Sequence, residues 1–264
     1  MEVEVNSMKL YKDYTTLEII LNKPCVVDDY CTLYPISMRD YNEFQKYIKY
    51  IMLSRKQLGL NSKDALLQSI VMASVYFSIE RPFDASDGEC LRVLDLVLRD
   101  ICNMFQILTK KEINYNICVD GSFEFVGEGI LIDNDNYEIV RDLAMKFALL
   151  KEPKVFKDKL YEEMYYRSLK ANRKEGASLE DVILTVVQDM KYTFDYIYEL
   201  NVVQLYSLYS RIVHVKNSDA ITIFRTCSSQ LPNVNFTDEI VDKLYTEESD
   251  DDLFVSLDEM AGML

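Results

Sequence analysis

Apolar residues recur at helical spacing along most of this chain, and this periodicity limits the possible folds more than any other feature. The clearest run follows Ser178, a residue type that often caps helices, and keeps the i, i+3, i+4, i+7 rule throughout. Its members are Leu179, Val182, Ile183, Val186, Val187 and Met190. Only 7 Gly and 5 Pro occur in 264 residues, so few positions can end a helix or form a tight turn. The sequence therefore predicts a mainly helical protein.

Other segments show the same pattern and set the expected helices. We expect one helix from Ser37 to Leu58 and a second from about residue 61 to residue 79. Residues 65–77 of the second are apolar nearly all round, which predicts a central position in the core. Further helices are expected at 89–108, 139–150, 153–171, 179–190 and 202–213, with a short segment at 193–200 and a weaker helix at 218–228.

The period changes near the middle of the chain. Residues 113–119 alternate between apolar and polar, Asp120-Gly121 follows, and Phe123 and Phe125 alternate again. An Asp-Gly pair between two alternating runs is a strong hairpin signal, and residues 130–132 predict a third strand. Short strands are also expected at 3–5 and 17–21. The expected fold class is α+β, predominantly α-helical, with a small antiparallel β-hairpin or meander near residues 112–133.

Charge and composition divide the chain into three expected parts. The basic, polar link at 170–176 predicts a boundary between an N-terminal domain at 1–172 and a helical subdomain at 177–245, and residues 246–264 form an acidic tail. The net charge is −15, which argues against a nucleic-acid partner. No apolar run predicts a membrane span, and the start of the chain lacks the pattern of a signal peptide. We therefore expect a cytoplasmic protein whose six cysteines are reduced.

Residues that could carry catalysis or bind a metal are sparse. His214 is the single histidine, and nothing around it resembles a catalytic triad, so we expect a partly exposed surface residue. Residues 133–136 resemble the start of a calcium loop, but Glu138 and Ala144 occupy the positions that need glycine and an acid. We expect no catalytic residue, no metal site and no cofactor, and hence a protein that is not an enzyme.

Tyrosines and the C-terminal tail indicate protein binding instead. The chain has 19 Tyr, and Tyr is enriched at protein interfaces, although each one can equally well lie at the edge of a core. The tail carries apolar residues at helical spacing within an acidic stretch, which predicts a short binding helix. The predicted partner-binding residues are Tyr206, Tyr209, Leu253, Phe254, Leu257 and Met260.

Several local patterns resemble the tail assembly chaperones of tailed bacteriophages that infect Gram-positive hosts. They are the segment 34–41 with Phe44, the segment 152–158, Ser178-Leu-Glu-Asp-Val, residues 192–200, Gln204-Leu-Tyr206 and the acidic end at 250–254. The resemblance implies a protein of the host cytoplasm that keeps a helical client, the tape measure protein, soluble during tail assembly. Two alternatives remain open from the residues: a phage protein that binds a host defence protein, and a virion structural component. A homo-oligomer is also possible.

Overall fold

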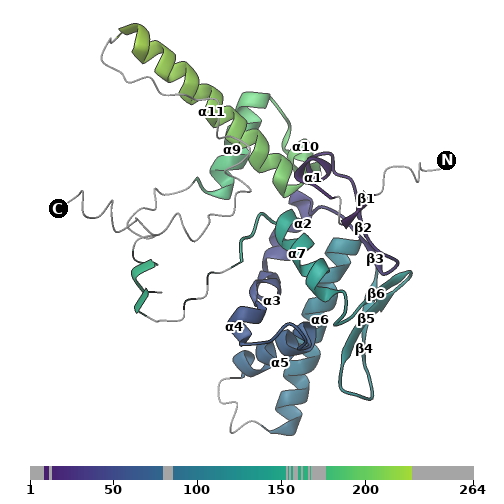
Figure 1. Cartoon of the computed structure of the whole chain (residues 1–264). Coiled ribbons are helices and arrows are strands. Elements are labelled where there is room, and N and C mark those ends of the chain that lie inside the picture. The colour runs from purple at the N-terminus through teal and green to yellow at the C-terminus, as the bar shows by residue number, and fades with distance from the viewer. Residues whose placement is uncertain are drawn as a thin grey trace, which may run out of the picture. The chain divides into compact units, whose positions relative to one another are not determined.

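The computed structural model describes residues 9–11, 14–79, 86–152, 154, 156, 160–161, 163–165, 167 and 177–227 (Figure 1). Contacts divide the chain into two compact units, residues 1–206 and 207–264. The boundary expected from sequence at 172–177 falls partly outside the described residues, as do the predicted strand at 3–5, most of the predicted helix at 153–171, and the whole tail.

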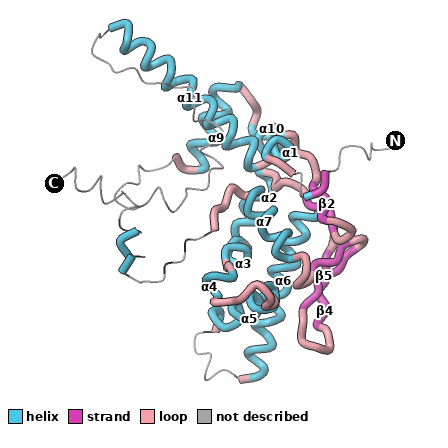
Figure 2. Tube along the Cα trace, viewed as in Figure 1, coloured by secondary structure: helices cyan, strands magenta, loops and turns pink. Residues whose placement is uncertain are grey.

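Helices make up most of the described chain (Figure 2). Those before the central strands are α1 (Thr16–Ile20), α2 (Met38–Gln45), α3 (Ile48–Met52), α4 (Arg55–Leu58), α5 (Leu66–Ser78) and α6 (Asp87–Thr109). Those after them are α7 (Tyr137–Phe147), α9 (Leu179–Met190), α10 (Phe194–Glu199) and α11 (Val202–Cys227).

Two small sheets complete the fold and confirm the α+β class. In the first, β1 (Lys9–Leu10) is parallel to β2 (Cys25–Val27), and β2 is antiparallel to β3 (Cys31–Leu33). In the second, β4 (Ile113–Ile117), β5 (Phe123–Gly127) and β6 (Ile130–Ile132) form the predicted antiparallel meander. Gly121 lies in the predicted turn with φ +82°, a backbone conformation that glycine adopts at little cost.

The core of the first unit lies between α6, the meander and α7. Phe105 of α6 is fully buried and makes edge-to-face ring contacts with Phe125 of β5 at 5.1 Å and Tyr137 of α7 at 6.3 Å. The two sheets meet where the backbone N–H of Leu131 donates to the carbonyl of Tyr30 at 3.0 Å. These contacts hold the sheets and α7 against one long helix.

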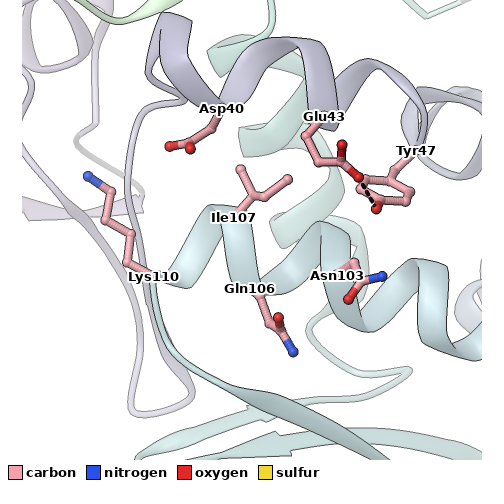
Figure 3. A pocket seen from close by; sticks show the side chains of 7 residues that line it. All are labelled: Asp40, Glu43, Tyr47, Asn103, Gln106, Ile107 and Lys110. Carbon is pink, nitrogen blue, oxygen red and sulfur yellow. Dashed lines mark hydrogen bonds between the residues drawn. The ribbon is translucent and has the colours of Figure 1, made fainter. Parts of the chain in front are cut away.

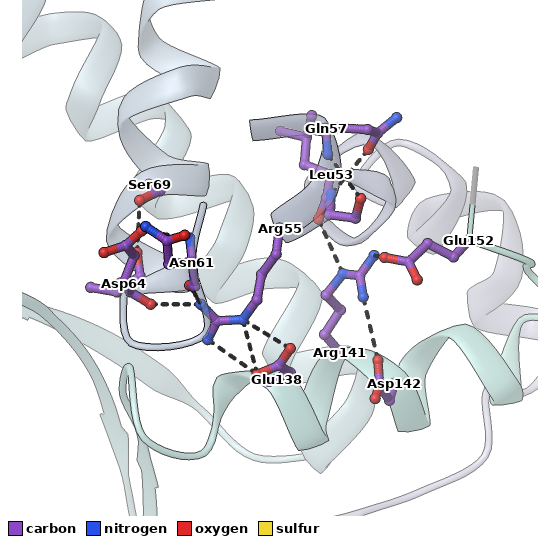
Figure 4. Close-up of polar contacts among 12 residues, drawn as sticks. Leu53, Arg55, Gln57, Asn61, Asp64, Ser69, Glu138, Arg141, Asp142 and Glu152 are labelled. Carbon is purple, nitrogen blue, oxygen red and sulfur yellow. Dashed lines mark hydrogen bonds and ion pairs between the residues drawn. The ribbon is translucent and has the colours of Figure 1, made fainter. Parts of the chain in front are cut away.

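The single helix predicted from Ser37 to Leu58 is wrong, because the chain forms α2, α3 and α4 there. Ser54 is fully buried and caps α4, and Leu53 before it is extended. The carbonyl of Leu53 accepts a hydrogen bond from Nε of Arg141 at 3.1 Å (Figure 4). Arg141 therefore holds the extended Leu53 in place and Ser54 starts a new helix directly after it, so the break depends on a residue far away in the sequence.

A second arginine explains why α5 begins at Leu66 and not near residue 61. Nη1 of Arg55 donates to the carbonyls of Asn61 and Asp64 at 3.0 and 2.7 Å, and the same guanidinium pairs with Glu138 of α7 (Figure 4). The segment is thereby held in a non-helical conformation.

Three further predictions need correction. The segment 17–21 is not a strand: residues 17–20 are helical in α1 and Leu21 is its C-cap. The backbone N–H of Thr15 donates to the Glu18 carboxylate at 3.1 Å and helps to start the helix. The two helices predicted at 202–213 and 218–228 are one helix, α11, because its sequence contains no Gly or Pro. Helix α5 is not surrounded by core, because Met72, Tyr76 and Phe77 are exposed.

Candidate functional site

Helix α9 buries only part of its apolar face. Ser178 caps it as predicted: Oγ of Ser178 accepts from the backbone N–H of Asp181 at 3.1 Å, and the Asp181 carboxylate accepts from the N–H of Ser178 at 3.3 Å. Of the predicted apolar stripe only Val182 and Val186 are buried. Leu184 and Met190 are exposed, whereas Leu179, Ile183 and Val187 are half-buried.

The following helix, α10, also exposes apolar groups, in this case aromatic rings. Thr193 caps α10, and Ile197 is its buried residue. Three aromatic side chains of α10, Phe194, Tyr196 and Tyr198, are about half exposed. We define the α9–α10 surface as Leu184, Met190, Phe194, Tyr196 and Tyr198, whose exposed fractions lie between 39% and 55%.

The segment that carries the α9–α10 surface is negatively charged. Between residues 178 and 200 the chain has five carboxylates and one lysine, a formal charge of −4. The carboxylates are Glu180, Asp181, Asp189, Asp195 and Glu199, and the lysine is Lys191. An apolar surface with an acidic surround favours an apolar partner that carries positive charge beside its apolar face.

Backbone hydrogen bonds fix α10 to the start of α2. The N–H of Met38 donates to the carbonyl of Leu200 at 2.8 Å, and the N–H of Val202 donates to the carbonyl of Ile36 at 3.1 Å. Ser37 and Asn201 form an antiparallel bridge between these two contacts. The segments 34–41 and 192–206, both of which carry the family resemblance, therefore lie side by side.

Two amide side chains complete this junction. Asn201 is buried, and its Nδ2 donates to the carbonyl of Ile19 at 2.7 Å while its Oδ1 accepts from the N–H of Gln204 at 2.8 Å. Nε2 of Gln204 donates to the carbonyl of Ile20 at 2.7 Å. We call Asn201 and Gln204 with these partners the α1–α11 junction. The glutamine of the Gln-Leu-Tyr pattern thus has a structural role in holding α11 against α1.

The predicted partner-binding residues fall into two groups. Tyr206 is half-buried, and burial together with nearby Tyr41 raises its pKa above 10.0. Tyr209, also half-buried, lies on the part of α11 that belongs to the second unit, as does half-buried His214. The remaining four residues, Leu253, Phe254, Leu257 and Met260, lie outside the described residues. Their role in binding stays a prediction.

Sequence reasoning noticed Tyr196 and Tyr198 but missed Leu184 and Phe194. Leu184 lies beside the predicted stripe of α9 and not within it. An apolar residue next to a full stripe widens the apolar face beyond what one packing partner covers. The extra width of the apolar face was therefore the feature of the sequence that could have identified Leu184.

A polar pocket of about 500 Å³ lies between α2 and α6 (Figure 3). It is lined by Asp40, Glu43, Tyr47, Asn103, Gln106, Ile107 and Lys110. The Glu43 carboxylate pairs with Lys46 and accepts from the Tyr47 hydroxyl at 2.7 Å, and these hydrogen bonds, first that from Lys46, lower its pKa below 4.5. Burial, followed by the bond to Glu43, raises the pKa of Tyr47 to about 12. The lining offers hydrogen bonds but no cysteine, serine or histidine as a nucleophile or base.

Across the described ranges, no three His, Cys, Asp or Glu side chains group in a way that could hold a metal ion. None of the helices described here combines the length and apolar content that crossing a bilayer requires.

Comparison with known proteins identifies one similar protein of viral origin. Over 120 residues the chain is 28% identical to the "SPbeta prophage-derived uncharacterized protein YomV" of Bacillus subtilis (strain 168). The alignment covers 45% of the chain and 50% of that protein, so the chain spans about half the length of the curated relative that it matches. No family model matches the chain. No solved structure matches it.

Proposed function

We propose that this protein is a non-enzymatic tail assembly chaperone of a phage, which binds the tape measure protein in the host cytoplasm and keeps it soluble. The observation that carries the proposal is the α9–α10 surface. The similarity to a prophage-derived protein supports a phage origin.

The size of the α9–α10 surface favours a binding role. At roughly 200 Å² for each side chain and about half of each exposed, the five residues present about 500 Å² of mainly apolar area. Exposed apolar area of this size often has a function where it is contiguous, as in the largest patch of about 300–600 Å² on a typical monomer. A client helix that lays apolar residues along α9 and α10 would bury this area.

The charge of the chain fits the same role. A net charge of −15 keeps a protein soluble, and it would do the same for a complex with an apolar, helical client. The acidic surround of the α9–α10 surface would also pair with lysine or arginine beside the apolar face of the client.

Co-expression with the tape measure protein of the same phage tests the proposal. We expect the two to co-purify, and the double variant Leu184→Asp with Phe194→Asp to lose the client because it places two charges in the contact. Val119→Asp is the control, because Val119 is fully exposed in the β4–β5 connection and belongs to neither α9 nor α10.

Two results would contradict this assignment. One is that the tape measure protein remains insoluble or unbound when the wild-type chain is co-expressed. The other is that the double variant binds as well as the Val119→Asp control. Stable incorporation into purified virions would instead support the alternative of a structural component.

A further inference from the structure

Three of the five carboxylates in the segment that carries the α9–α10 surface already have partners. The Asp181 carboxylate accepts from Ser178 at the start of α9, and Glu199 pairs with Arg39. Asp189 has a partner as well. These three carboxylates would have to give up an existing contact before they could bind a charge on another molecule.

The other two carboxylates, Glu180 and Asp195, are exposed, and their side chains form no hydrogen bond or ion pair within the residues that the structure describes. Each lies in the first turn of its helix, one turn before an exposed residue of the surface. Leu184 follows Glu180 by four positions, and Tyr198 follows Asp195 by three. Residues at these spacings are neighbours on one side of a helix. Each free carboxylate therefore lies beside an exposed apolar or aromatic group.

This arrangement matches the two parts of a lysine or arginine side chain. Such a side chain lays its apolar stem along an apolar surface while its charged end reaches a polar group. A client residue of this kind can cover Leu184 with its stem and bring its charge to Glu180. A second can do the same at Tyr198 and Asp195. A carboxylate of the client at either position would instead face a like charge.

Charge disfavours two other occupants of the α9–α10 surface. A second copy of the chain would bring the same formal charge of −4 against this segment. Residues 246–264 of the chain have apolar residues at helical spacing, but they also have seven carboxylates and no lysine or arginine. The occupant that fits is a helix of another protein with lysine or arginine beside its apolar face.

We propose that Glu180 and Asp195 select the client of the α9–α10 surface by pairing with lysine or arginine beside the apolar face of the client helix. This inference rests on the proposed function, and it adds that apolar contact alone does not determine which helix is bound. An exposed ion pair strengthens a contact by up to about fivefold, so two pairs give a preference of about tenfold over a neutral helix.

Three synthetic amphipathic helices test this selection. They share one leucine face and carry lysine, glutamine or glutamate beside it. In fluorescence anisotropy at low salt, we expect the wild-type chain to bind the lysine helix about tenfold more tightly than the glutamine helix, and the glutamate helix most weakly. At about 1 M salt, where charges are screened beyond about 3 Å, the three affinities should agree within about twofold.

Two double variants separate the effect of these carboxylates from that of the net charge. Glu180→Gln with Asp195→Asn should reduce the preference for the lysine helix to about threefold or less. Asp87→Asn with Glu89→Gln is the matched control, because it also removes two exposed carboxylates from the first turn of a helix, here α6, and changes the net charge equally. The control should keep the preference of the wild-type chain. Far-UV circular dichroism verifies that both variants are folded.

Equal binding of the lysine and glutamine helices by the wild-type chain would overturn this proposal and leave apolar capture of a client intact. The proposal is also overturned when the α6 control loses the preference as fully as the α9–α10 variant, because net charge alone would then explain it. If none of the three helices binds, Glu180 and Asp195 select no helix and the proposal is wrong. Co-expression with the tape measure protein then decides the chaperone function separately.

Discussion

Replacing Asn201 with alanine is expected to destabilise the first unit, because this side chain holds three segments together. Its Nδ2 donates to the carbonyl of Ile19 at 2.7 Å and to Oδ1 of Asn22 at 3.2 Å, and its Oδ1 caps α11 through the N–H of Gln204 at 2.8 Å. Alanine removes all three bonds at a site that is 1% exposed, where water cannot replace them easily.

The expected cost follows from what each partner loses. Loss of the helix cap costs about 1 kcal/mol. The carbonyl of Ile19 still accepts from the N–H of Asn22 at 2.9 Å when the bond from Asn201 is lost. Loss of the Asn201 bond therefore costs about 1 kcal/mol and not the full penalty of an unpaired buried group. With the weaker bond to the Asn22 side chain, the total is about 2–3 kcal/mol. For a unit of this size that corresponds to a drop in melting temperature of roughly 4–12 °C.

Two further variants separate the cap from the tether. Asn201→Ser keeps a capping oxygen for α11 and loses the donors to α1, so we expect a loss of about 1–1.5 kcal/mol. Asn201→Asp keeps the cap and the shape of the side chain, but it turns a carboxylate oxygen towards the Ile19 carbonyl and Oδ1 of Asn22, which are both acceptors. It should therefore cost at least as much as alanine.

Urea unfolding followed by far-UV circular dichroism measures these differences, with the m-value as a check that the mechanism of unfolding is unchanged. An Asn201→Asp protein as stable as wild type would refute the reasoning, because the donors to α1 would then contribute nothing. A loss below about 0.5 kcal/mol for Asn201→Ala would show that the α1–α11 junction does not stabilise the unit.

Three other predictions concern the core. Burial raises the pKa of the Cys25, Cys31 and Cys102 thiols from 9.0 to about 12, so above pH 9 these thiols ionise in the unfolded chain before the folded one. Stability should fall between about pH 9 and 12 in urea titrations, and a flat profile would contradict this. Arg141→Met leaves the Leu53 carbonyl without the Nε donor and should lower the free energy of unfolding by about 2–3 kcal/mol, measured by thermal melting. Arg141→Lys should not restore this stability, because lysine lacks the guanidinium fork. Phe105→Ala opens a cavity between α6, β5 and α7 and should cost about 3–5 kcal/mol, whereas a loss under 1 kcal/mol would mean that this ring is not central.

The sequence predicted correctly those elements that depend on interactions between residues close together in the chain. Ser178 begins α9 because its own side chain caps the helix, and Asp120-Gly121 forms a turn because glycine accepts a positive φ. The α+β class and the meander at 113–132 are confirmed for the same reason. Residues 17–21 show the limit, since a short apolar run fits a strand or a helix equally well.

Features set by distant residues could not be predicted. The break between α3 and α4 depends on Arg141, which lies 88 residues away from Leu53. Exposure of Met72 on α5 depends on which side of α5 the neighbouring helices cover, which the periodicity of α5 itself does not encode.

The candidate surface was only partly predictable for the same reason. The excess of Tyr indicated protein binding, and Tyr196 and Tyr198 lie on the α9–α10 surface. That α10 is fixed by the start of α2 follows from contacts such as the ion pair between Arg39 and Glu199, which are 160 residues apart.

The pairing of α2 with the end of α10 also determines when the protein can finish folding during its synthesis. Ribosomes add about 5–20 residues each second, so the 160 residues between Arg39 and Glu199 take roughly 8–30 s to make. Throughout that time the nascent chain has α1 and the start of α2 but not the residues that bond to them. A truncated product that ends before Asn201 lacks the partners of the Ile20 and Ile36 carbonyls and cannot close the first unit. Completion of this unit is therefore tied to the synthesis of a few residues near position 200, after its core helices have been made.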